Sequence, residues 1–192
     1  MEENYKQLKI IIEGLIFASE EPLNIEQLLK VLKELDPELT AESIKSILDE
    51  LVLDYQEKSI ELKEVGSGYR FQIRTEYAPW INKLWEKRPQ RYSKALLEIL
   101  AIIAYRQPIT RAEIEDIRGV SIHSNIMRTL TEREWISIIG YKDVPGRPAL
   151  YSTTDKFLDY FNLKSLEELP VLEDKMEKIV NDEHKEIMND EL

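Results

Sequence analysis

The residue types that carry most enzyme and metal chemistry are scarce in this chain. It contains no cysteine and two histidines, His123 and His184, which lie far apart in the sequence. A metal site needs several ligands at short, fixed spacings, and neither histidine belongs to such a pattern. Gly66 and Gly68 lack the further glycines of a phosphate-binding loop and predict a hairpin turn instead. We therefore expect a protein that is not an enzyme and that holds no metal and no cofactor.

Basic side chains are the remaining candidates for chemistry, because they can bind phosphate. Lys87, Arg88 and Arg91 lie near the middle of the chain and are candidate DNA contacts. Exposed linkers are also commonly basic for solubility alone, and this alternative stays open. The net charge of −11 weighs against a protein that depends on phosphate contacts, because residues 1–90 hold 12 bases against 18 acids.

One local pattern occurs twice, at residues 18–28 and 104–114. In both copies a proline stops an apolar helix, and a capping-box pair begins the next helix. The prolines are Pro22 and Pro108, and the capping pairs are Asn24 with Gln27 and Thr110 with Glu113. Two copies of this corner predict two copies of one small domain.

Each copy continues with a third helix and a β-hairpin, which is the order of a winged helix-turn-helix domain. The second hairpin contains Pro145-Gly146, a pair that suits a type II turn. The predicted fold class is mainly α with small β-hairpins (α+β), arranged as tandem winged helix-turn-helix domains. The polar, proline-marked linker places the first domain at 1–88 and the second at 89–170, followed by an acidic tail at 171–192 that we expect to be disordered.

A winged helix usually recognises DNA with its third helix, and neither third helix suits that task. The helix predicted over 40–56 has three net negative charges, from Glu42, Asp49, Glu50 and Asp54 against Lys45. Such a helix would be repelled by a groove lined with phosphate. The helix predicted over 123–134 has balanced charges, and the inward packing of its apolar residues explains it adequately.

Two helices carry more apolar surface than one small core requires. The segment from Ala95 to Ala104 has almost no polar face, so either the closing helix after residue 155 or a protein partner must cover it. We expect the first helix to mediate self-association, with Tyr5, Ile16 and Phe17 as the surplus beyond its inward stripe. The candidate dimerisation residues are Tyr5, Leu8, Ile12, Ile16 and Phe17.

Three segments of the second half form a specific pattern. Residues 97–119 read Leu-Glu-Ile-Leu-Ala-Ile-Ile-Ala-Tyr-Arg-Gln-Pro-Ile-Thr-Arg-Ala-Glu-Ile-Glu-Asp-Ile-Arg-Gly, and Arg128-Thr-Leu-x-Glu-Arg133 and Gly140-x-Lys-Asp-Val-Pro-Gly-Arg-Pro148 follow. This pattern resembles the bacterial segregation and condensation protein B family, over about residues 5–170. Trp135 stands where that family more often has a smaller aliphatic residue, so we expect different packing at the base of the second hairpin.

The resemblance implies a non-catalytic accessory subunit of the bacterial SMC condensin, acting in chromosome condensation and segregation. Such a subunit forms a homodimer, binds the kleisin (segregation and condensation protein A) and reaches the SMC ATPase through the complex. It is expected to be cytoplasmic and nucleoid-associated, with no membrane contact and with weak or indirect DNA contact. The alternative is a tandem winged-helix transcriptional regulator that binds DNA directly.

We place the kleisin site on the second domain, where the charge is neutral and the resemblance is densest. The candidate contacts are Tyr105, Arg106, Lys142, Arg147 and Tyr151. Proline residues stiffen the second hairpin, so it loses less entropy when it binds. The alternative is that both tyrosines cover the core and the prolines only shape the turn.

We predict that the isolated protein binds duplex DNA weakly and without sequence preference at physiological salt. The reason is the acid excess of residues 1–90 together with third helices that lack base-reading side chains. A mobility-shift titration over a range of salt concentrations measures this. Nanomolar, sequence-selective binding that persists at about 200 mM salt would contradict the prediction, because it requires several phosphate contacts.

Overall fold

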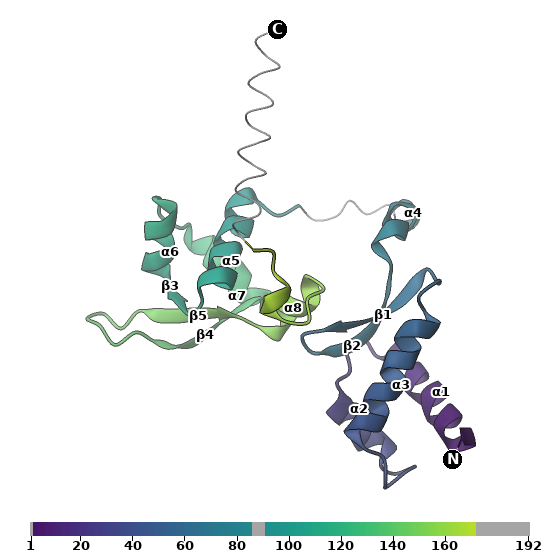
Figure 1. Ribbon diagram of the computed structural model, residues 1–192. Helices are drawn as coiled ribbons and strands as arrows, with labels where there is room; N and C mark the ends of the chain where they lie inside the picture. Colours follow the sequence, from purple (N-terminus) through teal and green to yellow (C-terminus); the bar gives the residue numbers. More distant parts are fainter. Residues whose placement is uncertain (1, 86–90, 172–192) are drawn as a thin grey trace.

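Two winged-helix units make up the chain in the computed structural model, which describes residues 2–85 and 91–171 (Figure 1). The predicted fold class is confirmed, because each unit consists of three helices followed by a small antiparallel hairpin. The predicted boundary between residues 88 and 89 lies outside the described residues. So does nearly all of the predicted tail at 171–192, of which only Val171 is described.

The first unit is built on capped helices, and it has one two-stranded sheet. Asn24 and Gln27 form the predicted capping box, each accepting the other's backbone N–H at 2.8 Å, and Thr40 caps the third helix. These caps satisfy donors that a helix leaves unpaired at its start. The elements are α1 (Glu2–Ala18), α2 (Ile25–Leu32), α3 (Ala41–Asp54), β1 (Ile60–Val65), β2 (Gly68–Ile73), the 3-10 helix η1 (Thr75–Tyr77) and α4 (Ala78–Trp85).

The second unit repeats this order and adds a third strand. Thr110 and Glu113 form the second predicted capping box. The Pro145-Gly146 turn is also confirmed, since the Arg147 N–H donates to the Val144 carbonyl at 2.9 Å and Gly146 has φ 87°. The elements are α5 (Lys94–Arg106), β3 (Ile109–Thr110), α6 (Arg111–Arg118), α7 (Ser124–Glu132), β4 (Ile136–Tyr141), β5 (Ala149–Thr153), α8 (Asp155–Tyr160) and η2 (Leu166–Glu168), with strand order β3-β5-β4.

The residue after each corner proline pairs with a tyrosine in the second strand of the following hairpin. Leu23 forms a bridge with Tyr69, and Ile109 pairs with Tyr151. Both pairings are antiparallel and occupy equivalent places in the two units. The duplication predicted from the sequence is therefore a duplication of tertiary pairing as well.

Each unit has its own hydrophobic core between its helices and its hairpin. The first core includes Leu28, Ile44, Ile47 and Leu51, and the second includes Ile99, Ile103, Ile114 and Leu130. Trp135 is buried at the base of the second hairpin, as the indole packs against several aromatic rings. Its ring centroid lies 5.2 Å from Tyr92, 4.5 Å from Tyr160 and 5.6 Å from Phe161.

Candidate protein-binding surfaces

The third helices hold their basic side chains in contacts within the chain. Lys45 donates to the Tyr69 hydroxyl at 2.6 Å and lies 3.2 Å from an Asp49 carboxylate oxygen. Burial acts to lower the pKa of Lys45, but these two hydrogen bonds outweigh it and raise that pKa. On α7, Arg128 pairs with Glu132 at 3.5 Å. On each of these helices an acidic neighbour therefore offsets the basic side chain.

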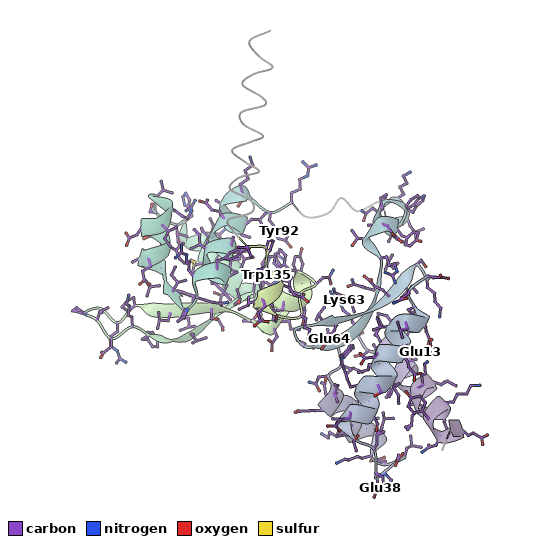
Figure 2. All side chains as sticks on the ribbon, in the orientation of Figure 1. Glu13, Glu38, Lys63, Glu64, Tyr92 and Trp135 are labelled. Atoms are coloured by element: carbon purple, nitrogen blue, oxygen red, sulfur yellow. The ribbon has the colours of Figure 1, made fainter. Side chains whose placement is uncertain are left out.

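Arg133, just after α7, also binds within the chain. Its guanidinium lies 4.9 Å from the ring centroid of Tyr92 and 5.3 Å from that of Trp135, and it donates to the Tyr92 hydroxyl at 3.0 Å. Tyr92 and Trp135 lie close together beside α8 (Figure 2). Arg133 therefore stabilises this aromatic cluster by cation–π contacts.

Only one of the three candidate DNA contacts can be placed. Arg91 is exposed ahead of α5, whereas Lys87 and Arg88 lie outside the described residues. Among the described residues, no group of three or more histidine or acidic side chains is placed to hold a metal ion. No helix in the described part of the chain has the length and apolar character needed to cross a membrane.

The five candidate kleisin contacts do not form one cluster. Arg106 and Glu113 line a shallow hollow beside α6, and Lys142 reaches this corner by pairing with Glu113 at 2.5 Å. Tyr105 is half-buried, and its hydroxyl donates to the Pro170 carbonyl at 2.7 Å. Arg147 is exposed in the turn of the β4–β5 hairpin, next to Pro148, whose carbonyl accepts from the Lys142 N–H at 2.9 Å.

Tyr151, the fifth candidate contact, belongs to the base of the hairpin. It lies opposite Ile109 in the β3–β5 pair and packs against the second core. Both tyrosines thus have structural contacts, while Arg106 and Arg147 are exposed. The arginines are the better placed of these residues for a polar contact with a partner.

Sequence inspection missed an apolar groove of about 260 Å³ on the second unit. It lies between α5 and the segment that begins with α8. Its lining residues are Leu97, Leu100, Ala101, Ala104, Tyr105, Phe157, Phe161, Leu163 and Leu169. The excess apolar surface of α5 was the available signal: the closing helix α8 covers part of that surface, and the groove is the part left open.

The predicted dimerisation face needs a correction. Ile16 was expected to be surplus, but only 3% of it is exposed, and it joins Leu8 and Ile12 in the first core. These three residues are spaced by four along α1, so they form one inward stripe. Tyr5 is half-buried and donates to a Glu50 carboxylate oxygen at 2.7 Å. Phe17 is 67% exposed, the one large exposed side chain of the predicted set, and its ring centroid lies 6.0 Å from that of Phe71.

Helix α4 presents a second exposed apolar face on the first unit. Trp80 is 65% exposed and Leu84 is 75% exposed, and the Tyr77 ring lies beside Trp80 with centroids 6.3 Å apart. No residue of α4 is buried among those whose side chains the structure describes. The sequence shows the aromatic and aliphatic residues of this helix, but not whether a core covers them.

Comparison with known proteins places the chain in a family. The model of the "Segregation and condensation complex subunit ScpB" family matches residues 10–172. The chain belongs to the ScpB family. A segregation and condensation protein B homolog from Coxiella burnetii is 57% identical over 173 residues, which cover 89% of this chain and 82% of the relative.

Two solved structures are also similar. A conserved hypothetical protein from Chlorobium tepidum is 37% identical, with 85% of this chain and 100% of that chain covered and a TM-score of 0.41. A dimer of the ScpB N-terminal domain complexed with ScpA peptide is 32% identical, covering 41% of this chain and 95% of that chain, with a TM-score of 0.36. The resemblance seen in the sequence is confirmed by the family match, and ScpB proteins are non-catalytic subunits of a complex.

The Lys142–Glu113 pair generates a prediction about pH. A hydrogen bond from Lys142 lowers the pKa of Glu113 to about 2, helped by the backbone N–H and hydroxyl of Thr110. Glu113 therefore stabilises the fold above its ordinary pKa of 4.5, and this contribution is lost as the pH falls from there towards about 2. Both side chains are more than a third exposed, so solvent screening keeps the effect on stability small.

We expect Lys142→Gln to raise the pKa of Glu113 towards 4.5, although the Thr110 donors still keep it below that value. Carboxylate NMR titration of the full-length chain measures this. Lys156→Gln is the matched control, because Lys156 pairs with Glu21 instead and should leave Glu113 unchanged. An identical Glu113 titration in wild type and Lys142→Gln would show that Lys142 does not cause the shift.

Proposed function

We propose that this chain is the ScpB-type accessory subunit of a bacterial SMC condensin, which dimerises and binds the kleisin ScpA in chromosome condensation and segregation. The observation that carries this proposal is the family match across residues 10–172. The proposed location is the cytoplasm, in association with the nucleoid. The DNA-binding regulator is disfavoured, because an acidic side chain lies beside the basic residue of each third helix.

The proposed division of labour assigns dimerisation to residues 1–88 and kleisin binding to residues 89–170. Two features support the second assignment. The apolar groove along α5 suits the apolar face of a partner helix, which is a common mode of peptide recognition. The exposed Arg147, at the tip of a hairpin shaped by Pro145 and Pro148, can pair with an acidic side chain at the edge of the contact.

An ScpB N-terminal domain has been solved as a dimer complexed with ScpA peptide. The first domain is therefore a second candidate location for the kleisin site of this chain. A binding experiment must therefore be able to separate the two domains, and substitutions in the full-length chain do so without requiring either domain to fold alone.

We expect Arg147→Glu and Tyr105→Ala each to weaken binding of the cognate ScpA by at least about tenfold, the loss typical of a truncated anchor residue. Tyr105→Phe keeps the ring but loses the hydrogen bond to the Pro170 carbonyl. It therefore distinguishes a role of the ring in binding from a role of the hydroxyl in holding the segment around Pro170. Isothermal titration calorimetry measures the affinities, and circular dichroism monitors folding.

Arg128→Glu is the matched control for Arg147→Glu, because Arg128 is also exposed on the second domain but lies on α7. It should bind ScpA like wild type. If Arg147→Glu and Tyr105→Ala bind normally while Phe17→Asp abolishes binding at a concentration where it is still a dimer, the kleisin site belongs to the first domain instead.

We expect the full-length chain to be a dimer at micromolar concentration, and Phe17→Asp to weaken that dimer. Burying an exposed aromatic side chain contributes roughly 1.5–3 kcal/mol, and a two-fold interface contains it twice. Analytical ultracentrifugation should therefore show at least about a tenfold rise in the dimer dissociation constant.

Tyr141→Asp is the matched control for Phe17→Asp, since Tyr141 is a similarly exposed aromatic residue on the second domain. It should leave the dimer intact. A dimer that tolerates Phe17→Asp but dissociates with Trp80→Asp would move the contact from α1 to α4.

A further inference from the structure

The turn of the first hairpin binds a carboxylate of the second domain. The Ser67 backbone N–H donates to Asp159 Oδ1 at 2.9 Å, and the Ser67 hydroxyl donates to Asp159 Oδ2 at 2.7 Å. One residue thus satisfies both oxygens of the carboxylate. Hydrogen bonds to a charged acceptor are about twice as strong as those between neutral groups.

Arg70, on β2, adds a second polar contact to the same end of α8. Its guanidinium donates to the Asp159 carbonyl at 2.8 Å and also to the Asn162 side-chain oxygen. Asn162 has a left-handed backbone conformation, with φ 57°. The end of α8 therefore offers two acceptors, one from the backbone and one from a side chain, to a single guanidinium.

The apolar part of the contact leaves no room for a larger residue. A Cβ atom on Gly66 would lie 2.6 Å from Leu158 Cβ and 3.3 Å from the Asp155 carbonyl oxygen. The turn can approach α8 this closely only because residue 66 is glycine. Ser67 is thereby brought within hydrogen-bonding distance of Asp159.

Two ion pairs flank this contact. Lys156 pairs with Glu21 at 2.7 Å, and Lys164 pairs with Glu64 at 3.0 Å. Figure 2 shows Glu64 on the first hairpin, on the side that faces the second unit. Both pairs are largely exposed, so they add little to the free energy of docking. Each of them joins a residue of the first domain to a residue of the second.

Asp159 is the only buried charged side chain among the described residues, with 7% of its surface exposed. A charge is buried at low cost only where hydrogen bonds satisfy it. The two donors to this carboxylate described above, the Ser67 backbone N–H and the Ser67 hydroxyl, come from the first domain, across 92 positions of sequence. Its burial therefore belongs to the docked arrangement of the two domains and not to the core of either one.

We infer that Asp159, Ser67 and Arg70 form an interdomain latch that holds the two winged-helix domains at one mutual orientation. With the latch closed, the surfaces of α1, α4 and α5 are presented to partners as parts of one rigid body. Asp159 is thus a positioning residue, since it acts through the placement of the domains and not through contact with a partner. This inference does not depend on which partner binds.

The absence of cysteine makes the latch directly measurable. Ser46→Cys on α3 and Ser121→Cys between α6 and α7 introduce one exposed labelling site in each domain. Double electron–electron resonance on the full-length, spin-labelled chain, diluted with unlabelled chain, reports the distance between domains within one molecule. We expect a single narrow distance distribution for the otherwise unchanged protein.

Asp159→Ala removes the two carboxylate acceptors of the latch and keeps the Asp159 carbonyl and Asn162 oxygen that accept from Arg70. Gly66→Ala forces the apolar contact apart, because its Cβ would overlap Leu158. For Asp159→Ala we expect the population ratio of docked to undocked molecules to fall at least about tenfold, because loss of one hydrogen bond to a charged group has an effect of this size. For Gly66→Ala we expect a fall in the same direction, because the added Cβ clashes with Leu158 in the docked state. The distribution should broaden or gain a second distance.

Asp116→Ala and Gly14→Ala are the matched controls, because Asp116 is exposed on α6 and a Cβ on Gly14 would meet open space. Both should keep the narrow distribution. Thermal unfolding by circular dichroism identifies any variant that fails to fold, in which case Ser67→Ala takes its place. A broad distribution in the unchanged protein, or a wild-type distribution in both latch variants, would overturn the inference.

Discussion

In each domain the residue after the corner proline pairs with the hairpin, and this pairing fixes where the hairpin lies relative to the helices. The positions of the surfaces that can contact a partner follow from it. In the first domain Leu23 and Tyr69 exchange two backbone hydrogen bonds, at 2.9 and 2.8 Å. A Cβ on Gly68 would lie 2.4 Å from the Leu23 carbonyl carbon, so this approach requires glycine. A one-residue slip would turn every hairpin side chain to the other face. The turn that carries Ser67 therefore has one position relative to the helices.

The same pairing in the second domain links the corner after Pro108 to the long hairpin. Ile109 pairs with Tyr151, and this contact sets the root from which the strands extend to Arg147. The two hairpins have different roles in spite of the common construction. The first is short and binds its neighbouring domain, whereas the second projects away from the helices (Figure 1).

Features with a local cause were predictable from the sequence. The capping pairs at Asn24 and Thr110, the Pro145-Gly146 turn and the order of elements each depend on residues a few positions apart. Features that depend on distant residues were not predictable. Ile16 is buried because α3 and the hairpin pack against α1, and the groove exists because α8 stops short of covering α5. Nothing in the segment around Asp159 distinguishes it from the many solvated acids of this chain.

The latch also limits how the two halves of the chain can diverge. Ser67 and Arg70 lie in one domain, and Asp159 and Asn162 lie in the other. A substitution in either domain therefore leaves a hydrogen-bonding group of the other domain without its partner. A chimaera that joins the first half of this protein to the second half of a relative keeps both hydrophobic cores intact. It keeps the mutual orientation only when these four positions are compatible. Inheritance of the two halves is thus coupled through four residues that belong to neither hydrophobic core.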